Sequence, residues 1–201
     1  MLYRRDCAAC HGPAGEGSSR GVPITEVGPA SVQYTLSTGR MPISSLDEPI
    51  RRGRPAYTPT EIDAIVTYTR AFVEGPEIPP LDVSDGVARG GELYRLHCAA
   101  CHSATGIGGA QAFGREAPPV FPGTSAEVAA VIAVGPAGMP SFRSTFDDRE
   151  IAAITEYVEL LKDPPTQGFV VPGGRVGEGL VAWLVGIGVL ALFIAWIGKR
   201  R

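Results

Sequence analysis

Two short stretches of this chain place two cysteines and a histidine at the same spacing. They read LYRRDCAACH from residue 2 and LYRLHCAACH from residue 93, and they agree at eight of ten positions. Cysteines at i and i+3 and a histidine at i+4 lie on one face of a helical turn. The two thiols can form thioethers with the vinyl groups of a haem while the imidazole binds its iron, which is the chemistry of C-x-x-C-H. The motifs predict thioethers at Cys7, Cys10, Cys98 and Cys101 and iron ligands at His11 and His102.

Other uses of paired cysteines fit the spacing less well. A four-cysteine zinc site would combine the two C-x-x-C pairs, but it gives no reason for a histidine after each pair. A thioredoxin-like redox pair requires a βαβ context, which the sequence does not indicate. We therefore predict two covalently bound haem c groups, one at each motif.

Each iron then needs a second axial ligand, and methionine is the best candidate. The chain contains three methionines, and apart from Met1 these are Met41 and Met139. Both stand directly before a proline, between a Cys motif and the helix that is predicted to follow it. Two methionines at corresponding places are better explained as ligands than as core packing. We predict Met41 at the first haem iron and Met139 at the second.

The remaining histidine, His97, lies directly before Cys98. Helix geometry points it away from the iron that His102 would hold, so we interpret it as a surface residue. An iron bound by His and Met has no open position, and its potential is higher than that of a bis-histidine haem. The predicted sites would therefore carry electrons. No residue of the chain stands out as a general acid, base or nucleophile.

Prolines and arginines flank the predicted ligands. A backbone carbonyl at Pro29 or Pro118 could accept the imidazole N–H and fix the orientation of the ligand, although both can equally be loop prolines. A group of arginines around Met41 could steer an acidic partner, although charge runs more often form a solvated face. These arginines are Arg40, Arg51, Arg52 and Arg54.

The helices that must position these residues also occur twice. The segment AEVAAVIAVG corresponds to SVQYTLSTG, and DDREIAAITEYVELLK corresponds to TPTEIDAIVTYTRAFV. The apolar period predicts helices over 58–73, with Thr60 as the N-cap, and over 147–162. The segment GVARGGELYRLHCAACH predicts a helix that runs into the second motif.

Two diverged helical repeats thus account for nearly all of the chain before residue 165. We place them at residues 1–75 and 86–163, joined by a linker at 76–85 that contains adjacent prolines. Gly 26 and Pro 18 together exceed a fifth of the 201 residues, which favours short helices and long turns over a sheet. The predicted fold is all-α, with two tandem cytochrome c-type domains in which the haem supplements a small core.

The C-terminal end predicts a membrane anchor. After a second linker at 164–178, residues 179–198 contain no charge and have a tryptophan toward each end. At about 1.5 Å per residue such a helix spans roughly 30 Å, the thickness of the hydrocarbon core. The basic tail 199–201 would then lie in the cytoplasm and both repeats outside it. A buried core helix is the alternative.

Charge is distributed unevenly along the chain. The net charge is −3; residues 1–75 hold eight acidic and eight basic side chains, whereas residues 76–167 hold twelve acidic and six basic. Nucleic-acid binding would need a basic face, and the sequence does not indicate one.

The order of these parts resembles a known family. The phrases LYRRDCAACHG, LSTGRMP, RGGELYRLHCAACH, GPAGMPSF and the ending GLVAWLVGIGVLALFIAWIGKRR are similar to the dihaem cytochrome c subunit of the actinobacterial menaquinol–cytochrome c reductase, the cytochrome bcc complex. The resemblance covers the whole chain. It implies cytochrome b and Rieske iron–sulfur subunits as partners, a haem-copper terminal oxidase as the acceptor, and a single-pass subunit of the cell membrane. It also implies that the first repeat faces the Rieske donor.

One departure from the family and several alternatives stay open. Family members have an export segment and a complete first helix, whereas six residues precede Cys7 here, so we expect further residues upstream. A membrane-anchored dihaem cytochrome that serves another dehydrogenase is the nearest alternative. A dihaem peroxidase would need an open or displaceable iron ligand, and a zinc-binding structural protein would bind no haem.

Overall fold

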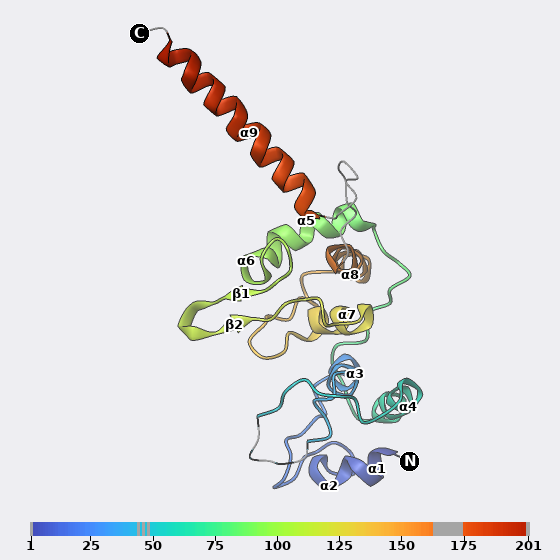
Figure 1. Ribbon diagram of the computed structural model, residues 1–201. Helices are drawn as coiled ribbons and strands as arrows, with labels where there is room; N and C mark the ends of the chain where they lie inside the picture. The colour runs from blue at the N-terminus through green and yellow to red at the C-terminus, as the bar shows by residue number, and fades with distance from the viewer. Residues whose placement is uncertain (1, 44, 46, 48, 163–174, 200–201) are drawn as a thin grey trace. The chain divides into compact units, whose positions relative to one another are not determined.

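A computed structural model describes residues 2–43, 45, 47, 49–162 and 175–199. The chain divides into two compact units, residues 1–162 and residues 163–201, and both sequence repeats lie in the first unit. Helices dominate the described residues (Figure 1). The helices of the first unit are α1 (Leu2–Asp6), α2 (Ala8–His11), α3 (Pro29–Ser37), α4 (Pro59–Thr69), α5 (Val87–His97), α6 (Ala99–His102), α7 (Ser125–Val134) and α8 (Asp148–Lys162).

The only regular strands among the described residues form a short antiparallel pair. Strand β1 (Gly109–Ala110) pairs with β2 (Glu116–Ala117), and a 3-10 turn at Ala112–Gly114 lies between them. The pair follows the second C-x-x-C-H motif directly. The mostly helical architecture that the composition predicts is therefore confirmed, with this small hairpin as an addition that the sequence analysis did not expect.

Helix α4 has the apolar face that its period predicts. Ile62, Ile65 and Val66 are buried and pack in one cluster with Val32 and Leu36 of α3. Its start differs from the prediction, because Thr58 and not Thr60 is the N-cap. Pro59 fixes the first helical position, so Thr60 lies inside the first turn and Thr58 forms a capping box with Glu61.

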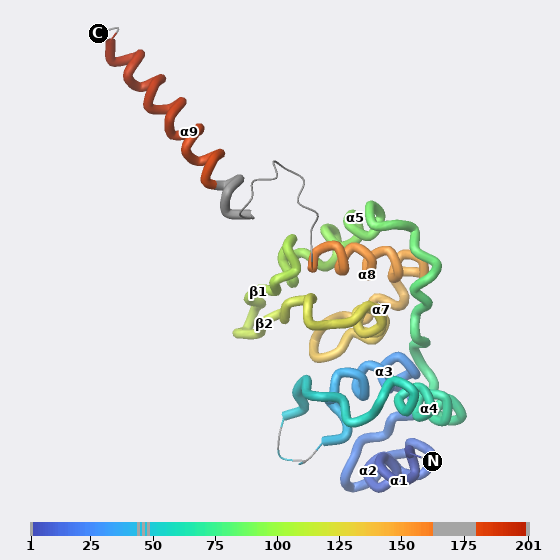
Figure 2. Tube along the Cα trace, turned by 45° about the vertical axis from the view of Figure 1, so that its right-hand side comes forward, coloured from blue at the N-terminus to red at the C-terminus, as the bar shows by residue number. Residues whose placement is uncertain are grey.

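Helices α5 and α8 lie side by side in the second repeat (Figure 1, Figure 2). Glycine is required at their crossing, since a Cβ at Gly90 would come within 1.9 Å of the Ala153 carbonyl oxygen. This close approach buries the apolar face of both helices. The core cluster here contains Leu93, Tyr94, Cys98, Ala129, Ile132, Phe146, Ile151, Ile154 and Val158.

The two repeats meet through one helix from each. Helix α3 packs against α7, and the contact is centred on Ala30, Tyr34 and Ala130, all of which are buried (Figure 2). Small side chains at a helix contact allow the two backbones to approach closely. The repeats are therefore joined by a packed interface as well as by the covalent segment between them.

The second unit contains helix α9 (Arg175–Gly198). Within it, Leu180–Gly198 is long and apolar enough to cross a membrane by length and composition. None of that stretch is buried in the structure, which argues against a core helix. The predicted linker 164–178 lies outside the described residues up to residue 174, and α9 begins at Arg175, before the apolar stretch.

Candidate haem c attachment sites

The two C-x-x-C-H turns have the same backbone conformation. Cys7 has φ −113° and ψ −37°, and Cys98 has φ −113° and ψ −36°. The His11 N–H donates to the Cys7 carbonyl and the His102 N–H to the Cys98 carbonyl, each at 2.9 Å. The structure therefore brings the two cysteines and the histidine of each motif onto one helical turn, as their spacing predicts.

A backbone carbonyl orients each histidine ring. Nδ1 of His11 lies 2.8 Å from the carbonyl oxygen of Val22, and Nδ1 of His102 lies 2.9 Å from that of Pro118. When Nδ1 carries the proton and donates it, Nε2 keeps its lone pair and can bind a metal. The role predicted for Pro118 is confirmed. The same role at Pro29 is wrong, because Pro29 is buried at the first position of α3, where it starts the helix.

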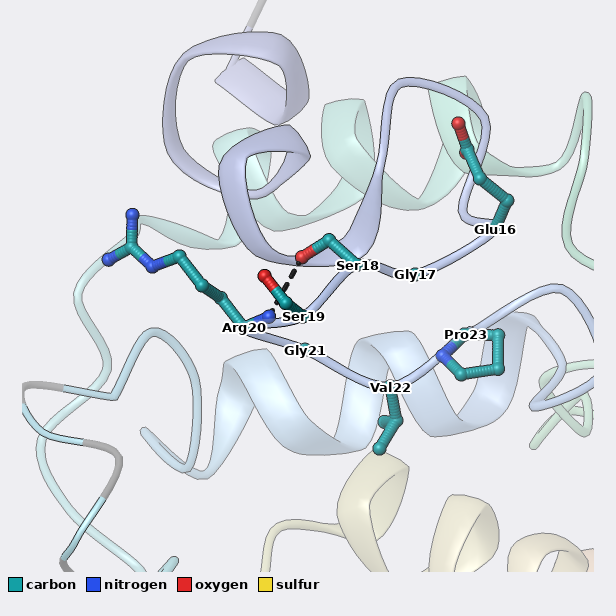
Figure 3. A pocket seen from close by; sticks show the side chains of 8 residues that line it. All are labelled: Glu16, Gly17, Ser18, Ser19, Arg20, Gly21, Val22 and Pro23. Carbon is teal, nitrogen blue, oxygen red and sulfur yellow. Dashed lines mark hydrogen bonds between the residues drawn. The ribbon is translucent and has the colours of Figure 1, made fainter.

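The sequence contains a signal for Val22 that the prediction missed. Val22 precedes Pro23, just as Pro118 precedes Pro119. A residue before proline is held in an extended conformation. Both histidine partners are therefore the residue directly before a proline in the loop after the motif. Figure 3 shows this segment in the first repeat, where residues 16–23 line a shallow hollow.

A buried tyrosine fixes the exit from each turn. The hydroxyl of Tyr3 donates to the Gly12 carbonyl at 2.8 Å, and that of Tyr94 donates to the Ser103 carbonyl at 3.0 Å. Burial raises the pKa of both tyrosines to about 12. Sequence reasoning missed these residues, although the repeated phrase LYR contains them. They fix the carbonyl that directly follows each histidine ligand candidate.

The first cysteine of each motif is shielded from solvent. Burial, with smaller contributions from Asp6 and Cys10, raises the pKa of Cys7 to about 11, and burial with Cys101 does the same for Cys98. In the described part of the chain, no three His, Cys, Asp or Glu side chains gather where they could hold a metal ion. The two C-x-x-C pairs are therefore not brought together into one four-cysteine site among these residues.

Both candidate methionine ligands lie at the edge of a core cluster. Met41 is half-buried against the α3–α4 cluster, and its N–H donates to the Thr35 carbonyl at 3.2 Å. Met139 is half-buried against the α5–α8 cluster, to which Cys98 also belongs. Each methionine thus packs within the repeat that contains its predicted histidine partner. Their binding to iron stays a prediction.

Comparisons with known proteins agree with this geometry. The chain is 34% identical to the cytochrome bc1 complex cytochrome c subunit of Corynebacterium diphtheriae, over 99% of this chain and 79% of that protein. It is 33% identical to the subunit of the same name from Mycobacterium leprae, over 100% of this chain and 74% of that protein. This chain belongs to the family of cytochrome bc1 complex cytochrome c subunits. The resemblance that the motifs indicate is thereby confirmed.

A cytochrome c domain is also found by a family model. Residues 85–158 match the family described as cytochrome C oxidase, cbb3-type, subunit III. This range contains the second C-x-x-C-H motif and Met139. Among solved structures, a reducing HAO-like protein complex of Kuenenia stuttgartiensis matches 80% of this chain and 93% of that chain at 19% identity and a TM-score of 0.37, a similarity too low to support an argument.

One arginine of this cytochrome c subunit fits the acidic groups of a haem. Nη1 of Arg40 is buried and has no hydrogen-bond partner among the described residues, and the guanidinium lies 4.7 Å from the centre of the Tyr34 ring. Arg40 directly precedes Met41. A buried guanidinium N–H is suited to a carboxylate, and a haem has two propionates. The residues around Met41 therefore fit a haem.

The four arginines predicted as one group have different environments. Arg40 is partly buried, whereas Arg51 and Arg54 are exposed. Arg52 forms an ion pair with Glu127 of the second repeat. The prediction of a single solvated face is therefore wrong for Arg40, whereas Arg52 is exposed and ion-paired. Exposed His97 lies against the rings of two phenylalanines, which agrees with its interpretation as a surface residue.

Proposed function

We propose that the chain holds two covalent haem c groups, one in a domain at residues 1–75 and one in a domain at residues 86–163. The observation that supports this most strongly is the match between the two C-x-x-C-H turns in backbone angles, hydrogen-bond lengths and the Nδ1 contact of the histidine. The same residues in the same geometry in both repeats support the same ligand at each. The thioether residues are Cys7, Cys10, Cys98 and Cys101, and the iron ligands are His11 with Met41 and His102 with Met139.

In this proposal the residues of the chain bind the two haems and orient their iron ligands. A bound haem would supply a one-electron couple, and ligation by His and Met would raise its potential relative to two histidines. The carbonyls of Val22 and Pro118 would accept the imidazole N–H and leave Nε2 free to bind the iron. Arg40 would offer its buried Nη1 to a propionate of the first haem.

The chain would act as a fixed electron relay in the respiratory chain. Its relatives are named subunits of the cytochrome bc1 complex, which supports cytochrome b and a Rieske iron–sulfur subunit as partners on the donor side. A haem-copper terminal oxidase is the proposed acceptor. Helix α9 would anchor the chain as a single span, with both haem domains on the extracytoplasmic side and the basic C-terminus in the cytoplasm.

Haem stoichiometry tests the central part of this proposal. The full chain, matured in a host that attaches haem c, should contain two covalent haems by pyridine haemochrome analysis. Cys7→Ala/Cys10→Ala and Cys98→Ala/Cys101→Ala should each retain one haem, since each pair of thioethers belongs to a separate group. A wild-type chain with one haem, or with zinc and no haem, would overturn the proposal.

Copurification tests the partners. After gentle detergent extraction, cytochrome b, Rieske and oxidase subunits should accompany the chain, and a variant that lacks residues 175–201 serves as the control for membrane anchoring. Recovery with a dehydrogenase and without cytochrome b would contradict the proposed relay.

A further inference from the structure

We infer that α7 of the second repeat positions the Met41 ligand of the first repeat, through the ion pair between Arg52 and Glu127. This inference rests on the proposed function, because it concerns the ligation of the first haem. It assigns Arg52 and Glu127 as positioning residues for Met41 and makes the first haem site dependent on the second repeat.

The ion pair joins an exposed segment to a nearly buried carboxylate. Nη2 of Arg52 donates to Oε2 of Glu127 at 2.8 Å and to the Pro122 carbonyl at 3.0 Å. The Glu127 side chain is 7% exposed and that of Arg52 is 41% exposed. Oε2 of Glu127 also accepts the N–H of Thr124 at 3.1 Å in the capping box of α7. The capping box thus holds the Glu127 carboxylate in place independently of Arg52. Leaving this nearly buried carboxylate without a cationic partner would destabilise the fold.

The residues next to Arg52 lie against the end of α3. The Gly53 N–H donates to the Thr38 carbonyl at 2.9 Å. Gly39 has φ +64°, and a Cβ there would come within 2.6 Å of the backbone of Arg54. Only glycine allows two backbone segments to approach this closely. Movement of Arg52 would therefore be transmitted directly to the C-terminal end of α3.

Met41 is attached to the same end of α3. The N–H groups of Arg40 and Met41 both donate to the Thr35 carbonyl, at 2.9 Å and 3.2 Å. Thr35 lies one residue after Tyr34, whose ring is covered by the Arg40 guanidinium and packs at the α3–α7 contact. The Met41 N–H is thus bonded to the residue that directly follows Tyr34 of the interface between the repeats.

The second candidate ligand provides an internal reference. The loop of Met139 is held within its own repeat, where the Ser141 hydroxyl donates to the Ala133 carbonyl at 2.6 Å and the Phe142 N–H donates to the Ile132 carbonyl at 2.9 Å. Loss of the Arg52–Glu127 pair should therefore weaken Met41 ligation and leave Met139 ligation unchanged.

The test compares Met ligation in full-length, haem-loaded variants in detergent. The variants are Glu127→Gln, Arg52→Ala and Arg52→Lys; Glu127→Gln is the sharpest, since Gln at this position keeps the capping box and removes only the charge. Arg70→Ala is the matched control, because Arg70 pairs with Glu77 on the surface of the first repeat. The readouts are the charge-transfer band of ferric Met-ligated haem and the apparent affinity for added imidazole, which competes with a loosened methionine.

In Glu127→Gln and Arg52→Ala we expect imidazole to bind one of the two haems roughly tenfold more tightly or better. The charge-transfer band should fall toward the half-amplitude expected of Met41→Ala, with Arg52→Lys intermediate and Arg70→Ala like the wild type. Trypsin should also cut faster after the exposed Arg51 in Glu127→Gln.

The inference and the proposed function fail in different ways. If Met41→Ala halves the band but Glu127→Gln leaves the band and imidazole affinity at wild-type values, the positioning role is overturned and the relay stands. An equal loss at both haems, or the same loss in Arg70→Ala, would also overturn it. If Met41→Ala leaves the band unchanged, or the wild type lacks two haems, the proposed function itself fails.

Discussion

Ser103 adopts a backbone conformation that ordinarily belongs to glycine. Its φ of 61° and ψ of 162° match Gly12 in the first repeat, which has φ 79° and ψ 160°. A side chain in this region costs about 1–3 kcal/mol. We expect Ser103→Gly to raise the free energy of unfolding by about 1 kcal/mol, because it removes this strain at the cost of one exposed hydroxyl contact to Thr105. Equilibrium unfolding of the full chain in urea measures the change.

A substitution at the equivalent residue of the first repeat is the control for Ser103→Gly. Gly12→Ala should destabilise the chain, because alanine would have to adopt the φ of 79° that Gly12 has. If Ser103→Gly lowered stability, the backbone conformation assigned to the second motif would be wrong.

Tyr94 gives the second repeat a specific response to alkaline pH. Burial raises its pKa to about 12, above the usual value of about 10. The contribution of the protonated Tyr94 hydroxyl to stability is therefore complete below a pH of about 10. It is lost as the pH rises through about 12. Tyr94→Phe should cost about 1 kcal/mol at neutral pH, because the Ser103 carbonyl loses its donor, and should flatten the fall in stability between those two pH values.

Urea titrations at several pH values check this prediction. Tyr157→Phe is the matched control, since its ring packs 5.4 Å from that of Tyr94 and the substitution leaves the Tyr94 hydroxyl in place. The prediction is contradicted if Tyr94→Phe retains the alkaline slope of the wild type.

At the scale of elements, the start of α4 depends on one side chain. The Thr58 hydroxyl accepts the Glu61 N–H, and the Glu61 carboxylate accepts the Thr58 N–H at 2.9 Å. We expect Thr58→Ala to lower the free energy of unfolding by about 1 kcal/mol. Thr60→Ala should change it by only a few tenths of a kcal/mol, since Thr60 is exposed within the first turn. Equal effects of the two substitutions in denaturant titrations would show that the helix does not begin at Pro59.

The same helix shows what periodicity can and cannot predict. The apolar spacing is sufficient to place α4 and its counterpart α8, because each buries an apolar face. Helices α5 and α7 are predicted from the correspondence between the repeats. The spacing does not fix where a helix begins, which depended here on Pro59 and not on the threonine closest to the apolar run. The hairpin β1–β2 has only two residues in each strand, too few to give an alternating pattern.

The candidate site was predictable where its contacts are local. The motif spacing alone placed both cysteines and the histidine of each turn, because all lie within one helical turn. The carbonyl partner of His11 depends on the path of the loop to Val22, whereas the sequence suggested only Pro29, with a loop proline as the equal alternative. Arg52 and Glu127 are 75 residues apart, and their contact depends on how α3 packs on α7, which no local pattern encodes.

At the scale of the whole molecule, the division into two units separates the proposed membrane anchor from the proposed haem sites. The unit of residues 1–162 holds all eight proposed haem ligands, and the other unit contains α9. A chain that ends at Lys162 should therefore stay in the supernatant after carbonate washing of membranes and still contain two haems, whereas the full chain should sediment. A stretch of 19 apolar residues partitions into a bilayer through its composition, so a variant with residues 180–198 in scrambled order should sediment like the wild type. If the shortened chain remained in the membrane pellet, attachment would depend on residues 1–162, and α9 would not be the anchor.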